Sequence, residues 1–170
     1  DAEGRPNARM CADLWFGKDG ETDTSIRNSF REEVKQALAG GYDHWLESPI
    51  GCLGLMIIVD QFPRNMFRGK AAMYSGDLIA RQIVDKEHRW EEHLSPIQQL
   101  FVPCLILTHS EEVESQQRCV DHYNKVEEYL PDEFRFFRGL FESHLRVIEL
   151  FGRFPHRNNI LGRTSTNDEV

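Results

Sequence analysis

The stretch SPIGCLGLMIIVD, residues 48–60, decides the fold class. Ser48 followed by Pro49 is typical of a helix start, with a capping hydroxyl and then a proline at the first helical position. The residues that follow are apolar on nearly every side, so the segment predicts a central, buried helix over residues 49–60. Pro63 is expected to end this helix, because the residue before a proline avoids the α region.

Helical periodicity extends to both sides of this segment. Apolar residues at helical spacing predict helices over residues 23–39, 49–60, 71–87, 97–107, 111–130 and 133–151. The expected helix ends are marked by Thr22 or Asp23, Ser95, Ser110 and Gly152, and by a capping box of Thr166 and Glu169. No β pattern and no linker rich in proline, glycine or serine interrupts the series. The sequence therefore predicts an all-α fold of six to seven helices in antiparallel hairpins, as a single domain over residues 1–170.

Composition excludes several classes of protein. The chain has 170 residues, of which 40% are hydrophobic and 28% charged, and this is the composition of a globular domain. The net charge of −8 is opposite to that of a nucleic-acid-binding surface. The longest apolar run, residues 50–59, is too short to span a bilayer. We therefore expect neither nucleic acid nor a membrane as a partner.

The cysteines indicate a reducing, cytoplasmic setting. Cys11, Cys52, Cys104 and Cys119 are widely spaced and lack the close pairing of zinc sites. Cys52 and Cys104 lie in apolar runs and are expected to be small core residues.

Metal and nucleotide motifs are absent from the sequence. There is no Glu-x-x-His, no His-Glu-x-x-His and no glycine-rich phosphate loop. The one close spacing, Asp85-x-x-His88, lies in a charged stretch typical of a solvated face. We predict no metal and no cofactor, although a metal site assembled from polar residues of separate helices stays open as an alternative.

Three helix junctions carry more polar chemistry than helix ends require. The first is DQFPRN, residues 60–65. Asp60 follows the most buried helix, so its carboxylate needs a partner, and Arg64 is the local candidate. A structural ion pair that fixes a tight turn is the alternative.

The second junction is THSEE, residues 108–112. Glu111 and Glu112 are expected in the first turn of the next helix, where negative charge is favoured. That does not explain His109 at the exit of an apolar segment, which is either a core histidine or a functional one.

The third junction is GRFPHRN, residues 152–158, followed by GRTST, residues 162–166. Three arginines and a histidine gather here in an acidic chain, which indicates an anion site, because guanidinium groups bind carboxylate or phosphate at two points. The alternative is that they cover the acidic ends of helices. The motif FPHRN also echoes FPRN of the first junction, either as a repeated turn or as two halves of one site.

His144 falls on the apolar stripe of the last long helix. It is expected to be buried, with a pKa below that of a free imidazole. A core histidine bonded to a backbone carbonyl is the alternative.

At these motifs the sequence resembles a bacterial family, the domain of unknown function numbered nine hundred and twenty-four, described as tetratricopeptide-like. The matching segments are residues 13–17, 60–65, 67–69, Asp77, 109–111, 144–158 and 161–166. The resemblance implies helical hairpins with right-handed superhelical packing, and a chain that continues slightly beyond Val170. It implies no activity.

We predict a site between helices that binds a small anionic ligand, with a histidine acting as general base. The candidate acid–base residues are Asp60, His109, Glu111 and His144. The candidate ligand-binding residues are Arg64, Asn65, Arg153, His156, Arg157, Asn158 and Arg163. Two alternatives stay open: a helical-repeat module that holds an acidic peptide or a carboxylate, and ion-paired turns with a purely structural role.

Overall fold

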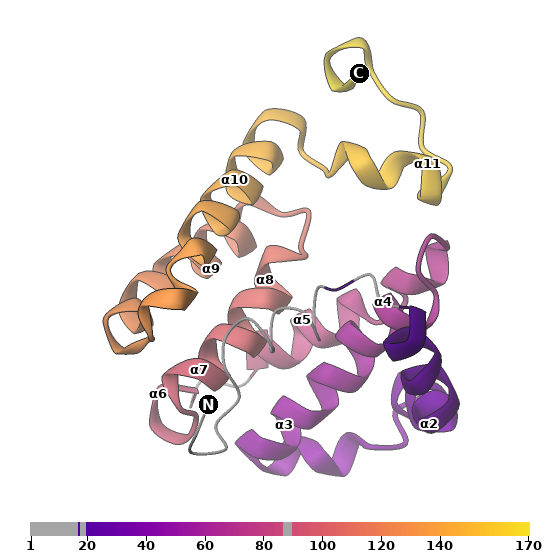
Figure 1. Cartoon of the computed structure of the whole chain (residues 1–170), viewed down its shortest axis with the longest axis vertical. Coiled ribbons are helices and arrows are strands. Elements are labelled where there is room, and N and C mark those ends of the chain that lie inside the picture. The colour runs from indigo at the N-terminus through magenta and orange to yellow at the C-terminus, as the bar shows by residue number, and fades with distance from the viewer. Residues whose placement is uncertain (1–16, 18–19, 87–89) are drawn as a thin grey trace.

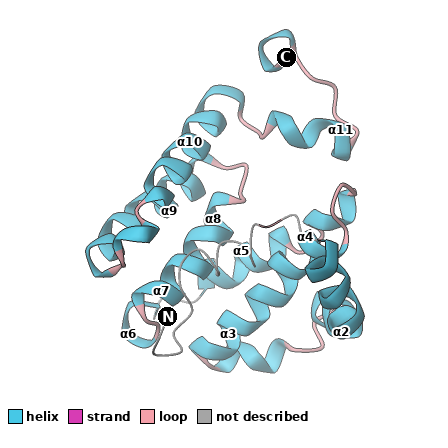
Figure 2. Cartoon of the chain, viewed as in Figure 1, coloured by secondary structure: helices cyan, strands magenta, loops and turns pink. Residues whose placement is uncertain are grey.

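The structure is a computed structural model that describes residue 17, residues 20–86 and residues 90–170. Over these ranges the regular elements are helices, and none is a strand (Figure 1, Figure 2). The α-helices are α2 (Gly20–Leu38), α3 (Pro49–Met56), α4 (Phe62–Met66), α5 (Asp77–Lys86), α6 (Trp90–His93), α7 (Pro96–Gln99), α8 (Leu105–Thr108), α9 (Val113–Val126), α10 (Phe136–Phe151) and α11 (Asn158–Leu161). The predicted all-α class is confirmed, and the tetratricopeptide-like superhelical packing stays a prediction. Cys11, His88 and residues 13–16 lie outside the described residues.

Residues 49–66 form one nearly continuous helix, made of α3, a π-helical turn at Ile57–Gln61, and α4. Its start is confirmed, because the Ser48 hydroxyl accepts a hydrogen bond of 3.1 Å from the Gly51 N–H. The expectation that Pro63 ends the helix is wrong. Pro63 lacks the N–H for the usual bond to the carbonyl four residues back, and the wider π turn before it lets the chain continue as a helix.

Four other helix starts differ from the predictions. α10 begins at Phe136 and not at residue 133, because Asp132–Phe134 form a separate 3₁₀ turn. α5 begins at Asp77, because residues Ala71–Tyr74 form a separate 3₁₀ turn. α2 begins before its expected caps, so Asp23 lies inside the helix. α9 begins at Val113, so Ser110 is not its N-cap.

The remaining end signals are confirmed. Ser95 and Gln98 form a capping box at α7, and Thr166 and Glu169 form another near the chain end. Gly152 ends α10 with φ of 66°, in the left-handed region that glycine adopts without steric cost. These signals act within a few residues of chain, which is why the sequence alone reveals them.

The core runs from the central helix to the α9–α10 pair. Met56 and Leu100 are fully buried, and Phe137 and Phe141 of α10 pack beside Tyr123 of α9, with the Tyr123 and Phe141 ring centroids 5.3 Å apart. Burying a large apolar side chain contributes about 1.5–3 kcal/mol, so this seam fixes the hairpin against the rest of the domain. Among the described residues, Cys52, Cys104 and Cys119 form no disulfide and are buried as small core residues.

Figure 1 shows that the C-terminal segment comes back toward helices from the middle of the sequence. After α10 the C-terminal segment, in yellow, leaves the α9–α10 hairpin and runs through α11 toward the side where α4 and α5 lie. Three parts of the chain that are distant in sequence therefore lie close together. They are the π turn with α4, the turn after α8, and the segment after Gly152.

Candidate functional site

The centre of the site is an ion pair within one helix. Asp60 lies in the π turn and is 3% exposed, and the Arg64 Nη2 donates to its Oδ1 over 3.1 Å. The pair is one helical turn apart, as the sequence predicted. Burial opposes the charge of Asp60, but Arg64 and His109 outweigh it and hold the pKa of this carboxyl below its usual range.

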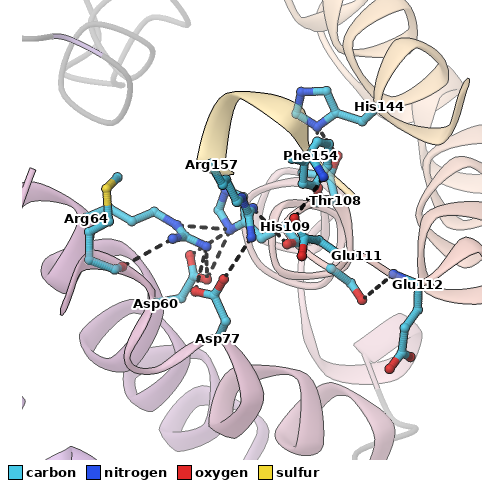
Figure 3. A network of polar contacts seen from close by, with 12 residues as sticks. Asp60, Arg64, Asp77, Thr108, His109, Glu111, Glu112, His144, Phe154 and Arg157 are labelled. Carbon is cyan, nitrogen blue, oxygen red and sulfur yellow. Dashed lines mark hydrogen bonds and ion pairs between the residues drawn. The ribbon is translucent and has the colours of Figure 1, made fainter. Parts of the chain in front are cut away.

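His109, from the turn after α8, contacts the same carboxylate (Figure 3). Its Nδ1 lies 3.0 Å from Asp60 Oδ1 and 3.3 Å from Arg64 Nε. The carboxylate only accepts and the Arg64 guanidinium only donates, so Nδ1 either donates to Asp60 or accepts from Arg64. We assign the Nδ1 proton to the shorter contact, the one with Asp60. Burial and the charge of Arg64 lower the pKa of His109, so the ring is neutral and its Nε2 carries a lone pair.

Asp77, at the start of α5, joins two arginines. It accepts from Arg64 Nη2 at 2.8 Å and from Arg157 Nη1 at 3.4 Å. Arg64 belongs to the motif FPRN and Arg157 to the similar motif FPHRN. The arginines of both motifs therefore bind the same carboxylate. Burial raises the pKa of Asp77, against the opposing effect of Arg64.

The guanidinium group of Arg157 lies close to two aromatic rings. Its guanidinium carbon lies 4.7 Å from the centroid of Tyr74 and 4.6 Å from that of Phe154. Its Nη2 donates to the His109 carbonyl at 2.9 Å, and its buried Nε has no hydrogen-bond partner among the described residues. The side chain is 7% exposed, and burial lowers its pKa. Arg157 therefore braces the turn that carries His109.

Glu111 fastens the C-terminal segment to the same turn. Its carboxylate accepts two hydrogen bonds from Arg163, at 2.6 and 3.0 Å, and one from the Phe154 N–H at 2.8 Å. Burial opposes the charge of Glu111, but these donors outweigh it and hold its pKa below the usual range. The prediction that Glu111 and Glu112 lie in the first turn of a helix is wrong, because α9 starts after them.

The other predicted histidines lie beside this cluster. His144 is half-buried on α10, its Nδ1 is 2.9 Å from the Thr108 hydroxyl, and burial lowers its pKa to about 4. His156 is exposed, with its ring 5.3 Å from that of Phe154. Neither is bonded to Asp60 or Glu111, so His109 is the histidine that gains a carboxylate partner.

Three predicted ligand-binding residues have structural partners elsewhere. Asn65 donates to Asp23 at 2.9 Å, on the side of the molecule that faces α2. Arg153 binds Glu169 at 2.6 and 2.7 Å, and Asn158 donates to the same carboxylate at 3.2 Å. These contacts shape the C-terminal turns.

A cavity of about 210 Å³ opens beside the cluster, between α5 and the turn after α8. The residues that line it are Asp77, Leu78, Arg81, Ile106, His109, Ser110, Glu111 and Arg157. The sequence analysis missed Arg81 as a site residue, and it noted Asp77 only within a family motif. Their spacing of four residues, which places them on one face of α5, is a signal that could have paired them.

Within the described ranges, no group of three or more histidine, cysteine, aspartate or glutamate side chains is arranged to hold a metal ion. Over the same residues, no helix combines the length and the apolar character needed to cross a bilayer. The side chains that line the cavity supply imidazole, carboxylate, guanidinium and hydroxyl groups.

Comparisons with known proteins agree with the fold. Residues 4–170 match the model of a family described as "Bacterial protein of unknown function (DUF924)". The chain is also similar to a solved structure of a protein of unknown function, ATU0120, from Agrobacterium tumefaciens. The two are 34% identical, with a TM-score of 0.80 over 96% of each chain. A search of curated proteins finds no match. With nearly its whole length covered by the family model, the chain belongs to the DUF924 family of bacterial proteins of unknown function.

Proposed function

We propose that the cavity beside His109 binds a small anionic molecule and that His109 accepts a proton from it. One observation carries this proposal: His109 lines the cavity while its Nδ1 is held by the buried carboxylate of Asp60. In the described part of the chain no hydrogen bond engages its Nε2, which is the nitrogen left for a bound molecule.

The charges around His109 suit a general base. Its lowered pKa keeps the imidazole neutral near neutral pH, so Nε2 is able to take a proton. The imidazolium that forms is stabilised by Asp60, which fixes the tautomer and the ring orientation. Asp60 is thus a positioning residue for His109.

The cations on the cavity wall favour an anion. Arg81 and Arg157 both line the cavity, and guanidinium groups recognise carboxylates and phosphates at two points. The cavity volume of about 210 Å³ favours a small metabolite as the ligand.

A structural role for the cluster is the competing explanation. It is favoured by the balance of charge, since Asp60 and Asp77 offset Arg64 and Arg157. In that case the cluster stabilises the fold and the cavity holds only water.

A thermal-shift screen separates the two explanations. Small carboxylates, phosphates and sulfonates are tested at millimolar concentration on the wild type, His109→Gln and the control His156→Gln. Binding raises the unfolding free energy by RT ln(1 + [L]/Kd), about 2.7 kcal/mol at a hundredfold excess over Kd. We expect a stabilising anion that acts on the wild type and the control but not on His109→Gln. If no anion stabilises the wild type, or if His109→Gln retains the effect, the proposal is wrong.

A further inference from the structure

Arg81, on the α5 wall of the cavity, has different partners from the other arginines near the cavity, Arg157 and Arg163. Arg81 forms an ion pair with Glu112 through Nη1, and its Nε lies 4.0 Å from the Asp85 carboxylate. The Arg81 side chain is 26% exposed, whereas that of Glu112 is 58% exposed. The partner of Arg81 is therefore a surface carboxylate that water reaches easily.

The other arginines near the cavity are fixed from several sides. Arg157 donates to Asp77 and to the His109 carbonyl and lies against two rings. Arg163 forms a two-point pair with Glu111. Releasing Arg157 for a ligand would break buried contacts, and releasing Arg163 would break a part-buried two-point pair, so both are costly. Releasing Arg81 would break an exposed pair, which stabilises by less than about 1 kcal/mol.

Arg81 also has unused bonding capacity. Its Nε is buried and has no hydrogen-bond partner among the described residues. A guanidinium group offers five N–H donors in a plane, suited to the two oxygens of a carboxylate. The contact with Glu112 thus leaves part of the donor set of Arg81 unsatisfied.

We propose that Arg81 anchors the carboxylate of the ligand and that Glu112 occupies this anchor when the ligand is absent. This inference rests on the proposed function of the cavity. In this proposal the Glu112 carboxylate competes with the ligand carboxylate for the Arg81 guanidinium. On binding, the ligand takes over Arg81 and Glu112 turns into solvent.

The rest of the lining indicates the class of ligand. Leu78 and Ile106 line the cavity beside Arg81 and His109, so an apolar body fits next to the charged end. Leu78 is 59% exposed, and covering it removes apolar surface from water. The ligand class is therefore a short carboxylic acid with an aliphatic or similarly apolar body, rather than a bare inorganic anion.

The test uses hexanoate as the probe, hexanamide as its uncharged counterpart and inorganic phosphate as the anion without an apolar body. Binding is followed by calorimetry and by NMR of the arginine Nε–H groups, on the wild type, Arg81→Gln and Glu112→Gln. The matched control is Arg135→Gln, which removes the same charge from an exposed pair with Asp132, outside the cavity lining.

We expect hexanoate to bind the wild type and to shift the Nε–H resonance of Arg81. Arg81→Gln weakens hexanoate binding about tenfold or more, as for loss of a hydrogen bond to a charged group. Glu112→Gln tightens it about twofold to fivefold, because the internal competitor is gone. Arg135→Gln leaves the affinity unchanged, and hexanamide binds no variant. Glu112→Gln keeps the test valid if Arg81→Gln unfolds.

Other results overturn the inference in distinguishable ways. Hexanoate affinity that is the same in Arg81→Gln and the wild type removes Arg81 as the anchor, and equal affinity in Glu112→Gln removes the competitor. Phosphate or hexanamide binding as tightly as hexanoate shows that the ligand class is wrong. If other anions in the thermal-shift screen bind the wild type while hexanoate does not, the ligand class fails and the proposed function survives. If no anion binds, both fail.

Discussion

The change Asp60→Asn removes one negative charge from the most buried part of the cluster with almost no change in shape. The carboxylate lies 3.1 Å from Arg64 Nη2 and 3.0 Å from His109 Nδ1, and the residue is 3% exposed. Two opposite charges about 4 Å apart attract by about 4 kcal/mol at the effective dielectric constant of a protein. Removing one partner of a buried pair costs about 3–5 kcal/mol.

We expect the lower end of that range for Asp60→Asn, about 3 kcal/mol, because Arg64 keeps Asp77 at 2.8 Å. For a chain of this length that lowers the melting temperature by about 6–12 °C. Urea unfolding followed by far-ultraviolet circular dichroism measures the free energy, and an unchanged m-value shows that the variant unfolds from the same compact state.

Asp132→Asn is the matched control for this experiment. Its carboxylate is likewise paired with an arginine, Arg135 at 2.8 Å, but the two side chains are 86% and 65% exposed. A surface pair of this kind contributes between 0 and about 1 kcal/mol. If Asp60→Asn destabilises the protein no more than Asp132→Asn does, then burial of the charge is not what makes the Asp60 pair important, and the description of the site is wrong.

Four further predictions concern other residues. The pKa of His144 is about 4 in the folded protein against about 6.5 when unfolded. The unfolded chain therefore binds the extra proton as pH falls from 6.5 to 4, and stability decreases by up to about 3 kcal/mol; urea titrations across this range should show a smaller decrease for His144→Gln. Glu111→Gln should release the C-terminal segment, seen as faster hydrogen exchange of the Phe154 amide than in the wild type, since that amide donates to Glu111 at 2.8 Å; unchanged exchange would contradict the role of Glu111 as a fastener. Gly76→Ala should destabilise strongly, because a Cβ there would lie 1.8 Å from the Val59 oxygen. At Gly139, inside α10, a Cβ would have no atom within 4 Å, so Gly139→Ala should stabilise the protein by about 0.5–1 kcal/mol. Thermal melts of both glycine variants measure these effects.

Local signals account for what the sequence predicted about the fold. The caps at Ser48 and Ser95 and the left-handed Gly152 depend on contacts within a few residues, and each is confirmed. One error has a local cause and another depends on a distant segment. Pro63 does not end its helix because a π turn precedes it, and α5 starts late where Gly76 packs against the Val59 carbonyl.

The same distinction applies to the candidate site. Asp60 and Arg64 are one helical turn apart, so their pairing follows from spacing alone. Asn65 directly follows Arg64, yet it bonds to Asp23, because neighbouring residues on a helix point in directions about 100° apart. Sequence similarity between FPRN and FPHRN therefore did not show which side chains share a site.

The sequence by itself determined an all-helical chain and the residue types that carry its chemistry, because helix periodicity, caps and the Asp60–Arg64 spacing are short-range. Only the tertiary structure decided that His109 contacts Asp60 across 49 positions and that Arg157 reaches Asp77 across 80. Those contacts depend on how α4, α5 and α8 pack and on where the segment after Gly152 returns. The packing arises from apolar burial, which is non-directional, so it leaves no local mark in the sequence to show which polar ends meet.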